Sequence, residues 1–436
     1  MTRYGGINPA LFVDLYELTM AAAYHENGIE GDATFEVVVR ALPRERNFLV
    51  AAGLADVVSA LDQWVFDDEA IAFVRSIPSL PASFVDRLAG LAFDGDIRAV
   101  AEGEVVFGQE PLLEVTGPLV EVQLLETLLL NLLGTATMQA SKAARVTLAA
   151  RGRPWADFSA RRDHGVGSAL SAARAAAIVG ASSTSLVEAG RRDALALSGT
   201  MAHAYVMAFA DERDAFRTFA RTFPTSATLL IDTWDTIQGA RHAVEVAREL
   251  AGEGIAVAAV RLDSGDLDDL SRHVRAILDD GECGGVRILA SGDLDEHRIA
   301  GLLDAGAPID GFGVGTRMGT SADAPSLGVV YKLVEDARGP KLKLAEGKRT
   351  LPGRKQVFRA DDHDVIGLSD EHVDGRPLMG PATVEPLDVI TRRCQSALEA
   401  LPRRLRSLEP ADPPYAVRLS PQLHALVDRL TAEHRR

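Results

Sequence analysis

From about residue 150 onward, short apolar runs alternate with charged or glycine-rich turns and then with helical patterns. The apolar runs show no polar alternation, which is typical of strands buried on both faces of a parallel sheet. Helical periodicity fills the gaps at 237–250, 267–278 and 294–303. Strand, turn, helix and strand again predicts βαβ units. The predicted strands are 155–158, 194–198, 227–231, 256–260, 286–290 and 309–314.

This many βα units in a row, without a long helical or antiparallel interruption, favours a barrel over an open sheet. In either arrangement the carboxyl ends of the strands open onto the place where a site belongs. The turns that follow the predicted strands are therefore the first place to look for chemistry.

The segments on either side of the βα units show a different pattern of hydrophobic and polar residues. Before the barrel we expect a helix at 14–28, with Asp14 as its cap and Gly28 at its end, and a long helix at 124–150. Short strands are expected at 34–40, 96–102, 104–108 and 112–117. After Val330 the pattern predicts β-hairpins, and the tail from Pro381 predicts two amphipathic helices. The expected domains are 1–125, 126–335 and 336–436.

Composition narrows the class of protein. The 436 residues are 47% hydrophobic, enough for a large core in about two domains. The only cysteines, Cys283 and Cys394, exclude a disulfide framework and a zinc-ligand cluster. No secretion signal precedes the first helix, and the most apolar helix, around 124–133, is too short to span a bilayer. We therefore expect a soluble cytoplasmic protein without a membrane partner.

The net charge of −16 argues against a nucleic-acid surface. It leaves room for small anionic ligands, because a local arginine cluster can override the global sign.

The most informative turn is the one after residues 256–260, which reads Arg-Leu-Asp-Ser-Gly-Asp. Arg261 and Asp263 bring opposite charges to a strand end, and Gly265 lets the backbone approach a ligand closely. The alternative is a plain connection in which Asp266 only caps the next helix.

Other turns carry candidate groups, each beside a plainer alternative. The run Gly-Phe-Gly-Val-Gly-Thr-Arg at 311–317 would cradle a phosphate, or form a simple turn. Arg161 and Arg162 would hold an anion in a bidentate manner, or lie solvated at a helix start. His203 lies between small residues at a strand end, where a histidine is either catalytic or structural. The basic residues of 348–355 either form a solvated face or close over phosphates.

The ordered set of motifs resembles the nicotinate phosphoribosyltransferase family. The motifs are DLYELTM at 14–20, the arginine pair at 161–162, SGTMAH at 198–203, RLDSGD at 261–266, GFGVGT at 311–316 and KRTLPGRKQVFR at 348–359. The resemblance covers about residues 10–360. It implies an irregular, TIM-like α/β barrel with a smaller N-terminal α/β domain, to which the tail adds a C-terminal extension. It also implies a homodimer whose active sites are shared between subunits.

The family joins nicotinate to 5-phosphoribosyl 1-diphosphate, with Mg²⁺ accompanying the diphosphate and ATP as co-substrate. By resemblance, Asp263 is the carboxylate beside the ribose, and His203 is the histidine that ATP phosphorylates. Nicotinate would contact Tyr16, Arg161, Thr200 and Arg261. The phosphoribosyl donor would contact Ser264, Gly265, Gly313, Gly315, Thr316 and Thr350. No residue is predicted to be a dedicated metal ligand.

One stretch departs from the family pattern. Residues 180–190 read GASSTSLVEAG, with Leu186 where the family usually has asparagine. Sister enzymes that use nicotinamide carry an aspartate in this region, whereas no acidic residue lies between Gly180 and Val187. Because a carboxylate there would repel nicotinate, its absence favours the acid over the amide. The rival hypotheses are a nicotinamide- or quinolinate-using transferase of the same fold, and a catalytically silent relative that only binds phosphoribosyl compounds.

Overall fold

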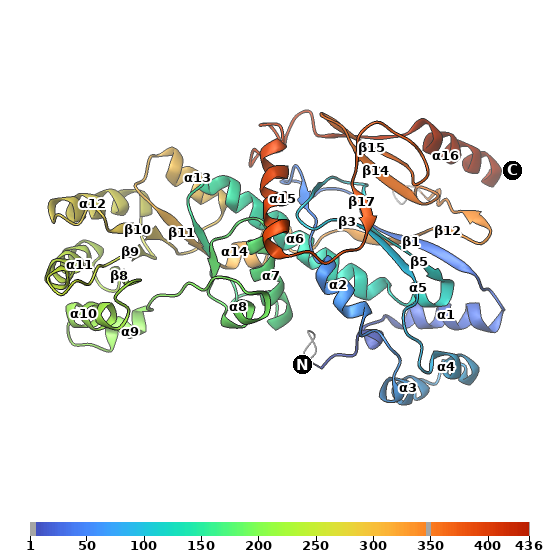
Figure 1. The fold of residues 1–436 in the computed structure, drawn as a ribbon, viewed down its shortest axis with the longest axis horizontal. Coiled ribbons are helices and arrows are strands. Elements are labelled where there is room, and N and C mark those ends of the chain that lie inside the picture. The colour runs from blue at the N-terminus through green and yellow to red at the C-terminus, as the bar shows by residue number, and fades with distance from the viewer. Residues whose placement is uncertain (1–5, 346–349, 436) are drawn as a thin grey trace. The chain divides into compact units, whose positions relative to one another are not determined.

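The computed structural model describes residues 6–345 and 350–435, and these form two compact units (Figure 1). The first unit combines the chain up to Ser141 with the chain from Ala324 onward. The second is the continuous segment Lys142–Asp323. The boundary at Ser141 lies inside one long helix, α6 (Glu126–Ala150). The three domains expected from the sequence stay a prediction, and the compact units begin and end at other residues.

The second unit contains a six-stranded parallel sheet in the order β7-β6-β11-β10-β9-β8. Its strands are buried on both faces, as their unbroken apolar runs predict. The strands are β6 (Trp155–Asp157), β7 (Ser183–Thr184), β8 (Thr228–Leu230), β9 (Ala259–Leu262), β10 (Arg287–Ala290) and β11 (Gly311–Val314).

Helices connect these strands in the expected βαβ manner. In Figure 1, α10, α11 and α12 follow one another beside strands β8, β9 and β10. The helices are α7 (Val166–Ile178), α8 (Val187–Asp193), α9 (His203–Met207), α10 (Glu212–Thr222), α11 (Thr236–Ala251), α12 (Leu267–Asp280), α13 (Glu296–Asp304) and α14 (Thr316–Gly319).

The sheet is curled, but its hydrogen-bonded order has two ends, at β7 and β8. A mixed α/β fold with a parallel sheet is therefore confirmed, whereas closure into a barrel stays a prediction.

Two strand predictions need correction. Residues 194–198 do not form a strand, because Ala194 has a left-handed backbone (φ 54°) at the end of α8. Only Leu197 pairs, in a single bridge with Thr184 of β7. Further along, β9 continues to Leu262, two residues past the expected end, so that Arg261 lies in the strand itself.

The first unit is built on a six-stranded antiparallel sheet in the order β13-β12-β1-β5-β3-β17. Its central strand β1 lies between β5 and β12, which comes from the far end of the sequence. The strands are β1 (Asp32–Val39), β3 (Asp96–Val100), β5 (Pro111–Pro118), β12 (Val329–Asp336), β13 (Gly339–Pro340) and β17 (Met379–Pro381), and a separate pair consists of β2 (Leu49–Val50) and β4 (Val105–Val106).

A large apolar core joins this sheet to the N-terminal helices. These helices are η1 (Pro9–Leu11), α1 (Leu15–Glu26), α2 (Leu54–Leu61), α3 (Asp68–Arg75), α4 (Ala82–Leu88) and α5 (Leu119–Gln123). Asp14 caps α1 as predicted, in a reciprocal arrangement with Glu17.

The predicted C-terminal hairpins and helices are also present. A four-stranded sheet has the order β16-β14-β15-β18, and a small apolar cluster joins it to the last helix. These elements are β14 (Lys355–Arg359), β15 (His363–Leu368), β16 (Arg376–Pro377), β18 (Ala416–Leu419), α15 (Leu387–Ala400) and α16 (Pro421–His434). No helix in the described part of the chain is both long and apolar enough to cross a membrane.

Candidate active site

The carboxyl ends of β8, β9 and β10 bring the predicted Asp263 together with polar residues from the two neighbouring strands. Asp232 follows β8, Asp263 follows β9, and Ser291 follows β10. Parallel strands place these positions at one edge of the sheet, where ligands bind in open α/β folds.

Asp263 is held on both sides. Its backbone N–H donates to Asp232 Oδ2 at 2.9 Å, and Ser291 Oγ donates to its carboxylate Oδ1. Ser264 Oγ donates to the same Asp232 oxygen at 2.6 Å. Asp232 therefore fixes the backbone of Asp263, the Ser291 hydroxyl orients its carboxylate, and the side chain is 38% exposed.

His203 is the first residue of α9 and faces Asp263. Its Nε2 lies 3.9 Å from Asp263 Oδ2, and its Nδ1 lies 3.1 Å from Thr233 Oγ1. The imidazole is 39% exposed. One ring nitrogen is thus fixed by a hydrogen bond, and the ring remains accessible. A histidine that accepts a phosphoryl group needs such an accessible imidazole.

Arg261, on β9 two residues before Asp263, binds the SGTMAH segment that ends in His203. Its guanidinium donates to Thr200 Oγ1 at 2.7 Å and to the carbonyl of Met201 at 3.1 Å, while its buried Nε has no partner. Burial lowers the pKa of the Arg261 guanidinium. The negative charges of Asp263 and Asp232 oppose this shift, whereas the positive charge of Arg161 adds to it. Two guanidinium groups therefore lie near one another, a suitable setting for an anion.

Arg161 is exposed on the loop after β6, and a buried network supports that loop. Asp157 Oδ1 accepts from the backbone and hydroxyl of Ser159, and Asp157 Oδ2 accepts from Thr184 of β7 at 2.8 Å. Ser159 Oγ also lies 2.9 Å from Asp163, whose pKa burial raises to about 6.

The glycine turn after β11 has a steric role as well as its predicted one. A Cβ on Gly313 would meet the Phe158 ring at 2.5 Å, and one on Gly315 would meet the Phe158 carbonyl at 3.1 Å. Thr316 is half-buried at the start of α14. Gly265 has the left-handed backbone (φ 79°) that its turn requires.

Two predicted residues belong to the first unit. Tyr16 is 46% exposed at the start of α1, where burial and a hydrogen bond to Glu126 raise the pKa of its phenol. Thr350 is nearly buried, at 5% exposed, and its N–H donates to the carbonyl of Lys343 at 3.4 Å. Lys348 and Arg349, which the sequence suggests as phosphate contacts, lie outside the described residues.

Sequence reasoning missed Asp232, Thr233, Ser291 and Phe158. A signal existed for the first two, since Asp-Thr-Trp-Asp follows a predicted strand just as RLDSGD does. Ser291 opens a second copy of the SGDLD phrase, but a repeated phrase does not reveal that one copy supports the other.

Comparisons with known proteins show the family of this chain. Residues 11–134 match the family model for the nicotinate phosphoribosyltransferase N-terminal domain. Nicotinate phosphoribosyltransferase pncB2 of Mycobacterium tuberculosis is 44% identical, over 97% of this chain and 94% of the relative. The Bacillus subtilis nicotinate phosphoribosyltransferase is 41% identical, over 84% of this chain and 75% of the relative.

Solved structures give the same result. The crystal structure of human nicotinic acid phosphoribosyltransferase has a TM-score of 0.84 and 29% identity, covering 96% of this chain and 99% of that one. A nicotinate-nucleotide pyrophosphorylase from Pyrococcus furiosus shares the fold, with a TM-score of 0.73 and 24% identity over 92% of this chain and 99% of that one. The chain is therefore a member of the nicotinate phosphoribosyltransferase family.

Proposed function

We propose that the protein joins nicotinate to 5-phosphoribosyl 1-diphosphate, giving nicotinate mononucleotide and diphosphate. The observation that carries this proposal is the cluster of Arg261, Thr200, His203 and Asp263 at the carboxyl ends of the parallel strands. Full-length similarity to enzymes named for this reaction supports it.

The site suits a displacement at the anomeric carbon. The pyridine nitrogen of nicotinate forms the new bond to C1 of the ribose, while the bond from C1 to the diphosphate oxygen breaks. Positive charge builds on the sugar as that bond breaks, so a carboxylate beside the ribose lowers the barrier. Asp263 is the candidate for this role, since Ser291 and Asp232 fix its orientation.

The nicotinate carboxylate needs a cationic partner and the ring needs an aromatic face. Arg161 and Arg261 would supply the charge, with Thr200 adding a hydroxyl that already accepts from Arg261. Tyr16 would stack on the ring. The donor phosphates would contact Ser264, Gly265, Gly313, Gly315, Thr316 and Thr350.

Bound Mg²⁺ would neutralise charge on the diphosphate as that group leaves. Among the described residues, no three histidine, cysteine, aspartate or glutamate side chains gather into a metal site. The residues present fit a metal that arrives with the diphosphate, because Mg²⁺ commonly uses one or two carboxylates plus substrate phosphates. The buried Asp232 Oδ1, which has no hydrogen-bond partner, is the nearest candidate carboxylate oxygen.

ATP coupling is the second part of the proposal. The terminal phosphoryl group of ATP would pass to His203, leaving ADP, and water would later release it as phosphate. The accessible imidazole and its contact with Thr233 support this role. Placing a phosphohistidine beside the donor site would link ATP hydrolysis to nucleotide formation.

Nicotinate, the acid, is preferred to nicotinamide because no carboxylate is available to repel it in one segment. No acidic residue lies between Gly180 and Val187, the segment that includes β7 beside the Arg161 loop. Nicotinamide or quinolinate is the alternative base.

We also propose that the parallel sheet completes a TIM-like barrel, and that two subunits share their active sites. The exposed side chains of Leu15 and Tyr16 at the start of α1 support a subunit contact there. Two cysteines without a disulfide are consistent with a cytoplasmic enzyme.

The test is product formation from phosphoribosyl diphosphate and Mg²⁺ with nicotinate, nicotinamide or quinolinate, each with and without ATP. We expect turnover with nicotinate alone among the three bases, and stimulation by ATP. His203→Ala should keep the basal rate within a few fold but lose the stimulation and the labelling by γ-³²P-ATP.

Turnover with only nicotinamide or quinolinate would contradict the specificity. No turnover with any base, despite binding of phosphoribosyl diphosphate, would favour the silent relative.

A further inference from the structure

Lys355, the first residue of β14, is 1% exposed and its ammonium group is fully engaged. Nζ donates to the carbonyl oxygens of Leu351 at 2.9 Å and Gly353 at 2.6 Å, and it lies 3.0 Å from Glu36 Oε2. The ammonium group thus makes two hydrogen bonds to main-chain carbonyls and one ion pair with Glu36. The sequence suggested a solvated or phosphate-facing lysine, and the structure shows neither.

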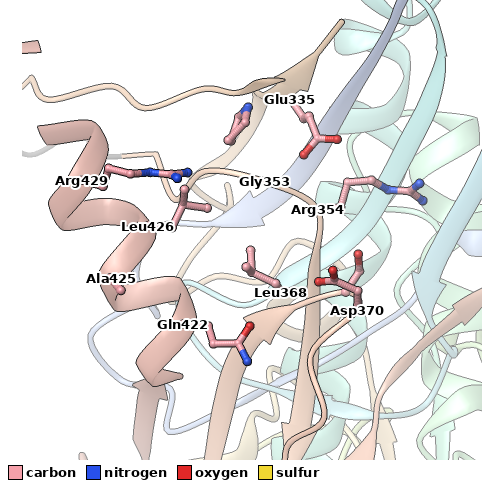
Figure 2. Close-up of a pocket in the computed structure, with 11 residues that line it drawn as sticks. Glu335, Gly353, Arg354, Leu368, Asp370, Gln422, Ala425, Leu426 and Arg429 are labelled. Carbon is pink, nitrogen blue, oxygen red and sulfur yellow. The ribbon is translucent and has the colours of Figure 1, made fainter. Parts of the chain in front are cut away.

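On its other side, the turn at 350–354 has Pro352 and Gly353 buried and Leu351 packed against an apolar cluster of β15 and α16. A hollow of about 630 Å³ lies there, lined partly by Gly353, Leu368 and Leu426 and by polar residues of α16 (Figure 2). Arg354 also lines the hollow, and its Nε donates to Glu114 at 3.1 Å. Packing and the Lys355 contacts therefore hold the turn together.

The backbone of the turn makes other hydrogen bonds as well, among them one from Ser369 N–H to the Arg354 carbonyl at 2.9 Å. Gly353 N–H donates to the carbonyl of Val334 at 2.9 Å, and Thr350 N–H donates to Lys343 at 3.4 Å. Gly353 has a left-handed backbone (φ 77°), which glycine adopts without the strain that a Cβ would bring. The carbonyls on either side of Pro352 both accept from Lys355, so one side chain holds the two ends of the turn.

Glu36 ties this arrangement to the most rigid part of the unit. It lies on β1, which pairs along most of its length with β5 on one side and β12 on the other. A carboxylate on a doubly paired strand is a fixed reference point, and Lys355 transmits that position to the turn.

We propose that Lys355, held by Glu36, is a positioning residue for the phosphoribosyl diphosphate site. It acts through Thr350, which immediately precedes the Leu351 carbonyl that Lys355 binds. This inference rests on the proposed function, in which Thr350 contacts the donor. A fixed turn presents Thr350 in one geometry, and small misplacements of such contacts are costly.

The test compares Lys355→Met and Lys355→Arg with the wild type. Methionine keeps the apolar stem but removes the donors, so we expect the KM for phosphoribosyl diphosphate to rise by roughly tenfold or more. The KM for nicotinate should change less than twofold. Arginine should restore part of the loss, since it can donate to the same carbonyls. Lys142→Met is the matched control, because Lys142 is equally buried and pairs with Glu296 and Asp323.

A double-mutant cycle with Thr350→Val separates positioning from stability. If Lys355 acts through Thr350, Lys355→Met should add less than twofold to the KM of the Thr350→Val protein. The inference would be overturned if the effects of Lys355→Met and Thr350→Val on the donor KM multiplied fully in the double mutant. It would also be overturned if Lys142→Met raised the donor KM as much as Lys355→Met. Titration calorimetry of phosphoribosyl diphosphate with Mg²⁺ should show the same pattern in Kd.

If Lys355→Met does not fold, Glu36→Gln replaces it, because glutamine keeps the shape and removes only the charge. An unchanged donor KM and Kd in Glu36→Gln would then count against the inference. If the wild type turns over nicotinate and the Lys355 variants keep a normal KM for phosphoribosyl diphosphate, this inference alone is wrong. A wild-type protein without turnover defeats the proposed function instead.

Discussion

Glu110 is a buried carboxyl group that the proposed chemistry does not use. It is 0% exposed, and Oε2 accepts from the backbone of Phe107 at 2.8 Å. Burial, followed by the charge of Asp364, raises its pKa well above the ordinary value. Asp364 in turn accepts from Arg359 at 2.6 Å and from the Tyr415 hydroxyl at 2.9 Å. Glu110 therefore keeps its proton at pH values where an exposed glutamate has lost it.

This shift predicts a pH-dependent stability. A group whose pKa is raised in the folded state adds to the free energy of unfolding. This contribution is fully present below the pKa of the group in the unfolded chain, about 4.3. That contribution is lost as pH rises from there through the folded pKa. Glu110→Gln, which mimics the protonated carboxyl, should leave the melting temperature at pH 4.5 almost unchanged and raise it progressively toward pH 8.

Melting curves from pH 4.5 to 8 check this. Glu433→Gln, on the exposed last turn of α16, is the control and should change little. A Glu110→Gln variant with a lower melting temperature at pH 8 than the wild type would contradict the assignment.

At the scale of elements, the loops after β9 and β10 depend on each other. Both contain Ser-Gly-Asp, and both glycines are left-handed, with φ of 79° at Gly265 and 90° at Gly292. A Cβ at Gly292 would lie 1.9 Å from the carbonyl oxygen of Asp263. The second loop therefore supports the backbone that carries the proposed catalytic carboxylate.

Gly292→Ala should consequently reduce kcat by about 100-fold, because the Asp263 backbone must move to relieve the clash. Gly301→Ala is the matched control: Gly301 lies in the exposed interior of α13, where an added Cβ meets nothing within 4 Å. It should keep full activity and gain up to about 1 kcal/mol of stability. Equal activities of the two variants, measured with saturating substrates, would refute this dependence.

The sequence predicts elements better than their pairing partners. Hydrophobic periodicity locates α11 and α12 to within two residues, because their apolar stripes face a buried sheet. It overestimates the strand at 194–198, whose composition suits a strand although Ala194 turns left-handed. The place of β12 beside β1 has no local signal, since it pairs residues that are about 290 positions apart.

The same limit applies to the site. Motifs indicate Arg261, His203 and Asp263, because charged groups at strand ends converge in a parallel sheet. The contacts that orient them, from Ser291, Thr233 and Asp232, depend on loop geometry. Lys355 is the clearest case: it belongs to a stretch rich in basic residues, but its side chain is buried beside Glu36.

At the scale of the whole molecule, the shared-site dimer that we propose would allow complementation between two defective subunits. Tyr16→Ala removes the proposed stacking partner and Asp263→Asn the proposed ribose carboxylate, so each homodimer should be nearly inactive. In a random mixture about half of the dimers are mixed, and each would have one intact site of two. Co-expression should therefore restore about a quarter of wild-type activity.

Activity is measured on the purified co-expressed protein, carrying a different tag on each subunit. Co-expression of Asp263→Asn with Arg261→Ala, both in the second unit, is the control and should restore far less. Recovery that is equal in both mixtures would contradict sites shared through Tyr16.

The two units also differ in when their residues become available during synthesis. The second unit is one continuous segment, Lys142–Asp323, so it can fold while synthesis continues. The first unit cannot, since β1 must wait for β12 until most of the chain has been made. During that interval one edge of β1 has no strand beside it, and unpaired edges recruit other chains. Slow translation beyond residue 141 would therefore prolong the period in which the nascent chain is most prone to aggregate.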